Sequence, residues 1–153
     1  MLPFALTIFT GAFLLFLVQP LIGKYILPWF GGTPGVWTTC MLFFQLVLLA
    51  GYAYAHFTSR WLRPRQQAIV HLVLLGAAVA VLPIIPADAW KPQAAESPIG
   101  YILLLLGACI GLPYFVLSTT GPLMQAWFAR LNPGRSPYRL YALSNIGSLL
   151  ALL

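Results

Sequence analysis

The chain has 153 residues, of which 61% are hydrophobic and only 7% are charged, and its mean hydropathy is +0.90. A soluble domain carries about 25% charged residues, so this composition excludes an ordinary soluble protein and indicates a membrane protein. The net charge of +6 comes from cations in short loops between apolar runs, which is typical of a topology signal and not of a nucleic-acid-binding surface.

The first apolar run predicts a transmembrane helix over residues 3–23. The run carries no charged side chain, and about 20 residues at ~1.5 Å each cross a hydrocarbon layer of ~30 Å. It lacks the basic start and the small-residue cleavage site of a secretory signal peptide. We therefore expect it to be retained as a span.

A sharp reversal follows, and the rest of the chain is organised around it. Residues 19–37 read QPLIGKYILPWFGGTPGVW and contain Pro20 and Pro28, whose missing N–H groups weaken a helix. The Gly-Gly-Thr-Pro-Gly run within them favours a turn. The first span is therefore expected to end here, and a second span is predicted over residues 36–57.

Three more apolar runs predict a third, fourth and fifth span, at residues 67–85, 99–120 and 140–153. The fifth run has 14 residues, which make about 21 Å of helix and do not cross a bilayer. We therefore expect the chain to be a fragment of a longer protein, whose missing part begins inside the fifth span.

Two prolines are expected to interrupt the fourth apolar run. Pro113 is expected to kink its helix, and Pro122 to begin a short interfacial helix over residues 122–131. The predicted fold class is therefore all-α: a polytopic helical membrane bundle in a single domain, residues 1–153, with four full transmembrane spans plus the start of a fifth.

The charged residues predict the orientation of this bundle. In the predicted topology all the arginines lie on one side of the membrane, and the two acids, Asp88 and Glu96, lie on the other. By the positive-inside rule, the arginine-rich loops and the N-terminus are cytoplasmic. We expect a multi-pass protein of the inner (plasma) membrane. The arginines are Arg60, Arg63, Arg65, Arg130, Arg135 and Arg139.

Aromatic residues are expected at both membrane interfaces, where their amphipathic rings are favoured. An outer belt and an inner belt follow from the predicted topology. The outer belt contains Trp29, Trp37, Trp90 and Tyr101, and the inner belt contains Tyr54, Trp61, Trp127, Tyr138 and Tyr141.

Polar side chains at membrane depth are the candidate functional residues, because burying them is costly. Gln19, Lys24 and Gln45 are predicted to converge on an outward-facing polar pocket beside the proline-broken end of the first span. The alternative is that each has a structural role: Lys24 snorkels to the head groups, and Gln45 pairs with a neighbouring helix.

A second polar cluster is predicted on the cytoplasmic side, formed by Ser118, Thr119, Thr120 and Asn145. The alternative is that these hydroxyl groups bond to carbonyl groups of their own helix. Neither cluster holds an acid, so no catalytic constellation can be assembled, and no metal site or cofactor is predicted. Cys40 and Cys109 are interpreted as small buried filler.

Two blocks of the sequence resemble a known family. They are Phe16–His56, with Pro28-Trp29-Phe30-Gly31-Gly32, and Gly111–Leu153, with Ser118-Thr119-Thr120-Gly121-Pro122-Leu123. Together they look like the membrane domain of the bacterial spermidine synthase-like proteins, which fuse a transporter-like membrane domain to an aminopropyltransferase-like domain. The resemblance implies a soluble Rossmann-type domain C-terminal to the spans, which this chain lacks.

Three functions follow as expectations. The first is a membrane domain that anchors, or channels substrate to, a cytoplasmic aminopropyltransferase-like domain. The second is a transporter-like half-bundle that binds or moves a small solute, although the absence of an intramembrane acid counts against a cationic solute such as a polyamine. The third is a structural protein that self-associates through Gly107-x-x-x-Gly111. The expected partners are the lipid bilayer, a soluble catalytic domain or a second copy, and no nucleic acid.

Overall fold

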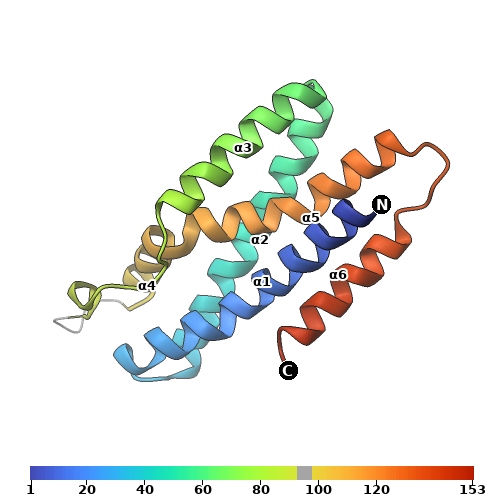
Figure 1. Ribbon diagram of the computed structural model, residues 1–153. Coiled ribbons are helices and arrows are strands. Elements are labelled where there is room, and N and C mark those ends of the chain that lie inside the picture. Colours follow the sequence, from blue (N-terminus) through green and yellow to red (C-terminus); the bar gives the residue numbers. More distant parts are fainter. Residues whose placement is uncertain (93–97) are drawn as a thin grey trace.

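The computed structural model describes residues 1–92 and 98–153, and the described part is built from helices without a strand. Figure 1 shows them gathered into one elongated bundle. The helices are α1 (Leu2–Ile26), η1 (Leu27–Trp29), α2 (Pro34–Trp61), α3 (Pro64–Ala80), η2 (Asp88–Trp90), α4 (Pro98–Leu106), η3 (Gly107–Gly111), α5 (Leu112–Leu131) and α6 (Tyr138–Leu150).

Three stretches of helix are long and apolar enough to cross a membrane: Leu2–Trp29, Pro34–Trp61 and Ile99–Leu131. They contain the first, second and fourth predicted spans, so the prediction of an all-helical membrane protein is confirmed. The third and fifth predicted spans correspond to α3 and α6, which have 17 and 13 helical residues.

The helix that contains the fourth span is longer than expected. The predicted separate interfacial helix over residues 122–131 is wrong, because α5 runs without a break through Pro122 to Leu131. A proline inside a helix removes one N–H donor, and neighbouring helices can hold the helix together around it. Leu123 and Phe128, on the far side of Pro122, are fully buried in the bundle.

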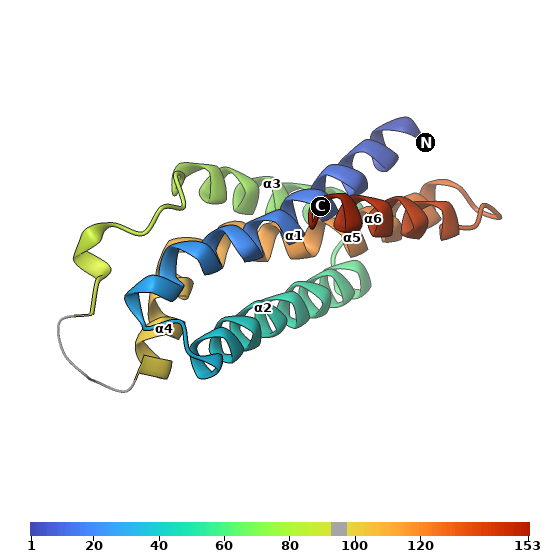
Figure 2. The ribbon, with the colours of Figure 1, turned by 90° about the horizontal axis from the view of Figure 1, so that it is seen from below.

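The expected irregularity at Pro113 lies just before that residue. The chain forms a π-helical turn, η3, between α4 and α5, and Pro113 is the second residue of α5. A proline cannot donate to the carbonyl group four residues earlier, here Cys109, so the regular helical pattern is broken there. Figure 2 shows that α4 is bent away from the axis of α5.

The third helix ends earlier than predicted. The sequence places the end of this span at residue 85, but α3 ends at Ala80. Pro83 and Pro86 lie beyond it, and the residue before each proline disfavours the helical conformation. The apolar run therefore continues past the helix as an irregular segment.

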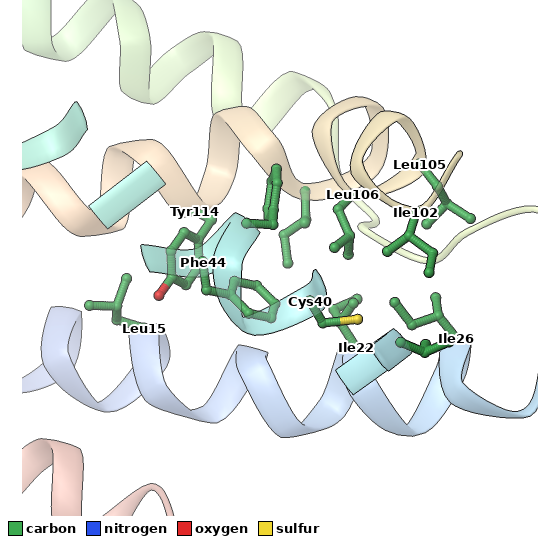
Figure 3. Packing of buried hydrophobic residues seen from close by; sticks show 12 residues of the cluster. Leu15, Ile22, Ile26, Cys40, Phe44, Ile102, Leu105, Leu106 and Tyr114 are labelled. Atoms are coloured by element: carbon green, nitrogen blue, oxygen red, sulfur yellow. The ribbon is translucent and has the colours of Figure 1, made fainter. Parts of the chain in front are cut away.

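Most of the packing in the bundle involves α5, which contacts α1, α2 and α3, while α6 packs against α1. The main buried cluster joins the second half of α1, the first half of α2 and the α4–α5 region (Figure 3). In it the rings of Phe44 and Tyr114 lie 4.9 Å apart. A smaller cluster of Ile8, Phe128 and Leu140 joins α1, α5 and α6.

Two glycines allow these helices to approach closely. A Cβ atom on Gly51 of α2 would overlap the side chain of Ser118 on α5. A Cβ atom on Gly147 of α6 would lie 2.7 Å from the carbonyl oxygen of Phe9 on α1. Small residues at helix–helix contacts are typical of membrane bundles, where close backbone packing replaces the hydrophobic effect.

Candidate functional site

The six arginines gather at one end of the bundle, which we call the arginine end. The guanidinium group of Arg130 donates a hydrogen bond to the backbone carbonyl of Ser59, so the ends of α5 and α2 lie together. Pro64, which is flanked by Arg63 and Arg65, lines the same small cavity as Arg130.

The N-terminus lies at the arginine end as well. Met1 lines a cavity together with Arg135 and Arg139, in the loop before α6 and its first turn. Figure 1 shows the N-terminus, the turn between α2 and α3 and the loop between α5 and α6 on one side of the bundle.

The opposite end holds the two lysines and several aromatic rings. The Nζ atom of Lys91 lies 5.7 Å from the ring centre of Trp29, close enough for a cation–π contact. The hydroxyl group of Tyr101 donates to the carbonyl oxygen of Trp90 at 3.2 Å. Glu96, predicted to lie in this region, is outside the residues that the structure describes.

The three residues of the predicted polar pocket form no hydrogen bond with one another among the described residues. Gln19 is half-buried on α1, and its Nε2 atom donates to the hydroxyl group of Tyr114 at 2.6 Å. Lys24 and Gln45 are exposed, and among the described residues neither forms a hydrogen bond with Gln19 or with the other. Gln19 therefore has a protein partner, while Lys24 and Gln45 face the surroundings of the bundle.

The residues of the predicted cytoplasmic cluster are also not all together. Ser118, Thr119 and Thr120 follow one another on α5, and each hydroxyl group bonds to a carbonyl oxygen three or four residues earlier, at 2.7–2.8 Å. Ser118 Oγ also lies 3.3 Å from the carbonyl oxygen of Val47 on α2. Asn145 is exposed on α6.

A buried hydrogen-bonded pair that the sequence analysis did not single out joins α3 to α5. Gln67 is fully buried. Its Oε1 atom accepts from the indole N–H of Trp127 at 2.7 Å, and its Nε2 atom donates to the carbonyl oxygen of Leu62 at 2.7 Å. The available signal was a glutamine at the start of an otherwise apolar run.

Near this pair, three buried polar atoms have no hydrogen-bond partner within the described part of the chain. They are the hydroxyl oxygens of Tyr54 and Ser59 on α2 and the Nδ1 atom of His71 on α3. The rings of Tyr54 and His71 lie 6.4 Å apart. The junction of α2, α3 and α5 is therefore more polar than the rest of the interior.

Two further hollows lie between helices in the described part of the bundle. One, of about 360 Å³, lies between α1, α3 and α5 and is almost wholly apolar, with Leu14, Leu75 and Tyr114 among its walls. The other, of about 430 Å³, lies between α2 and α5 at the arginine end. Tyr114 is the one residue with a polar side chain among those that line the first hollow.

The described residues contain no cluster of side chains that could bind a metal ion. Within residues 1–92 and 98–153, no three His, Cys, Asp or Glu side chains come together as a metal site would require. Cys40 and Cys109 are both free thiols, the first buried and the second half-buried.

In comparisons with protein-family models, curated proteins and solved structures, nothing matches this chain. The resemblance to the spermidine synthase-like family therefore stays a prediction, based on the motifs quoted from the sequence.

Proposed function

We propose that the chain crosses the membrane four times, begins a fifth crossing in α6, and has its arginine end in the cytoplasm. Support comes from the relative direction of the helices. Gly51 of α2 lies beside Ser118 of α5, and Ser59, further along α2, contacts Arg130, further along α5. The two helices therefore run in the same direction.

Two parallel spans require a return crossing between them. The segment between α2 and α4 contains α3, whose 17 residues make about 26 Å of helix. The irregular segment after Ala80 supplies the remaining length to reach the opposite end. This supports α3 as a span, and the positive-inside rule supports a cytoplasmic arginine end.

Thiol labelling of intact cells tests this topology. Starting from Cys40→Ala/Cys109→Ala, single cysteines are introduced by Thr33→Cys, Arg65→Cys and Lys91→Cys. A membrane-impermeant maleimide should label the variants at positions 33 and 91, and label position 65 only after the membrane is permeabilised. Labelling of positions 65 and 91 from the same side would show that α3 does not cross.

We further propose that this bundle anchors an aminopropyltransferase-like domain at the cytoplasmic face, as the resemblance implies. The observation that carries this proposal is that several polar groups inside the bundle are bonded to other protein groups. Gln19 bonds to Tyr114, Gln67 bonds to Trp127, and the hydroxyl groups of Ser118 and its neighbours bond to carbonyl oxygens. Such pairing stabilises one fixed arrangement, which suits an anchor.

The mass of the protein purified from native membranes tests the anchor proposal. This chain alone has a mass of 16.8 kDa. A much larger product with aminopropyl-transfer activity in its soluble part would support the proposal. A product of about 16.8 kDa would contradict it, because the proposed catalytic domain would then not be on the same polypeptide.

A second candidate is a transporter-like half-bundle, and one observation favours it. The apolar hollow between α1, α3 and α5 is lined by apolar residues and by Tyr114, the one lining residue with a polar side chain, so Tyr114 is the residue that an amphipathic solute would meet there. A solute bound there should raise the thermal stability of the wild type and not that of Tyr114→Phe. If the solute raised the thermal stability of Tyr114→Phe as much as that of the wild type, the solute would bind outside this hollow. Transport that depends on Gln45 would indicate the same.

A further inference from the structure

The hollow at the arginine end, which we call the α2–α5 groove, combines polar and apolar walls. Its volume is about 430 Å³. It is lined by Tyr52, Ala55, His56, Ser59 and Arg60 of α2 and by Pro122 and Ala126 of α5.

The polar residues of the groove lie toward the arginine end. Arg60 is next to the last residue of α2 and Ser59 precedes it, while Tyr52 is eight residues before Arg60, about 12 Å deeper along the helix. Ala55, Pro122 and Ala126 make the remaining wall small and apolar. The lining of the groove thus changes from apolar to cationic over about 12 Å along α2. A phospholipid has the same order of groups, with apolar acyl chains at one end and a charged head group at the other.

Among the residues that the structure describes, no carboxylate lies at the cationic end of the groove. The whole sequence contains two acids, Asp88 and Glu96. Asp88 is in η2, at the opposite end of the bundle (Figure 1), and Glu96 lies outside the described residues. No side chain in the described part of the chain therefore neutralises the arginines at this end.

Ser59, which lines the groove, has a polar side-chain atom without a protein partner in the described part of the chain. Its carbonyl oxygen accepts a hydrogen bond from Arg130, and it is next to Arg60 in the chain. Its hydroxyl oxygen is buried and has no hydrogen-bond partner among the described residues. Ser59 therefore adds to the lining of the groove a polar side chain that no described residue pairs with.

We propose that the α2–α5 groove binds an anionic phospholipid. The phosphate contacts Arg60 and His56, next to Ser59, and one acyl chain lies along Ala55 and Ala126. Basic pockets between spans attract anionic head groups, at about 1 kcal/mol for each arginine near the surface. A zwitterionic lipid brings its own cation to the arginines and gains less. The proposal does not depend on whether the bundle anchors an enzyme or binds a solute.

Lipid titration of the full chain in a neutral detergent tests the site. Phosphatidylglycerol, phosphatidylcholine and inorganic phosphate are added separately, and the melting temperature is followed. Phosphatidylglycerol should stabilise the wild type at the lowest concentration. Arg60→Gln should raise the half-maximal concentration roughly fivefold, which corresponds to the loss of one arginine contact.

Arg135→Gln is the matched control, because Arg135 is exposed at the same end but lines a different cavity. This variant should bind phosphatidylglycerol like the wild type. Equal weakening in both variants would indicate general charge attraction and overturn the proposal. Equal stabilisation by inorganic phosphate would overturn the assignment to a lipid.

Ala126→Phe tests the apolar half of the groove without changing any charge. It should also weaken phosphatidylglycerol binding, since the larger side chain fills the space assigned to the acyl chain. Retention of full affinity in this variant would contradict the proposal, even if Arg60→Gln failed to fold.

Discussion

At the scale of single residues, the tightest constraint is the contact between Gly51 and Ser118. A Cβ atom at position 51 would lie 2.8 Å from the Cβ atom of Ser118 and 3.0 Å from its backbone carbonyl carbon. Backbone cannot move aside as a flexible side chain can. This one position therefore sets how closely α2 and α5 pack.

We predict that Gly51→Ala destabilises the bundle by about 1–3 kcal/mol, the usual cost of forcing extra volume into a packed site. The measurement is thermal or denaturant unfolding in detergent. Gly76→Ala is the matched control, because nothing lies within 4 Å of the Cβ atom it would add on α3. Equal effects of the two substitutions would show that α2 and α5 are not in close contact.

The bond between Gln19 and Tyr114 is a long-range polar contact between α1 and α5. Tyr114→Phe keeps the buried ring and removes the hydroxyl group, so we predict a loss of about 0.6–2 kcal/mol, typical of hydrogen bonds between membrane helices. Gln19→Leu should cost a similar amount, and the double variant less than the sum of the two. Strict additivity in this double-mutant cycle would mean that the bond does not contribute to stability.

At the scale of elements, α3 is the helix least enclosed by the bundle, since it packs mainly against α5. The Gln67–Trp127 hydrogen bond holds the start of α3 in place. We predict that Trp127→Phe increases hydrogen–deuterium exchange in α3 and leaves exchange in α1 unchanged, because the lost hydrogen bond joins α3 to α5 and does not involve α1. Trp61→Phe, at a position 72% exposed, is the control and should change neither helix. An equal rise in α1 would indicate global loosening instead.

The elements themselves were largely predictable, because each long apolar run became a helix. The effect of Pro122 was not predictable, since whether a proline ends a helix depends on neighbours that pack on both sides of it. The side of each helix that faces the interior of the bundle could not be predicted from the sequence either. In a membrane the lipid-facing and core-facing sides are both apolar, so the sequence could not separate Gln19, which has a partner, from Gln45, which is exposed.

The polar contacts in the structure differ from the predicted polar clusters because the sequence does not show which sides of the helices face one another. Ser118 and its neighbours were identified as polar at depth, and the structure shows hydroxyl groups bonded within their own helix. Gln67 and Trp127 are 60 residues apart, and only the folded arrangement brings them together. Local sequence carries no information on a pairing that depends on how α3 lies against α5.

At the scale of the whole molecule, the charge distribution is strongly one-sided. The six arginines and the N-terminus share one end, and the two lysines lie at the other. The bias of lysine and arginine sets the orientation of membrane proteins during insertion. The arginine end should therefore decide which way the bundle faces.

We predict that replacing all six arginines by glutamine inverts a substantial fraction of the molecules, because Lys24 and Lys91 then carry the remaining cationic bias. The measurement uses Ser136→Cys as reporter in a background of Cys40→Ala/Cys109→Ala. An impermeant maleimide should label it from outside only when the arginines are gone. Lys24→Gln/Lys91→Gln, the opposite change, should leave the reporter protected. If the arginine-free variant also remains protected, the apolar spans and not the charges determine the orientation, and the cytoplasmic assignment of the arginine end loses its physical basis.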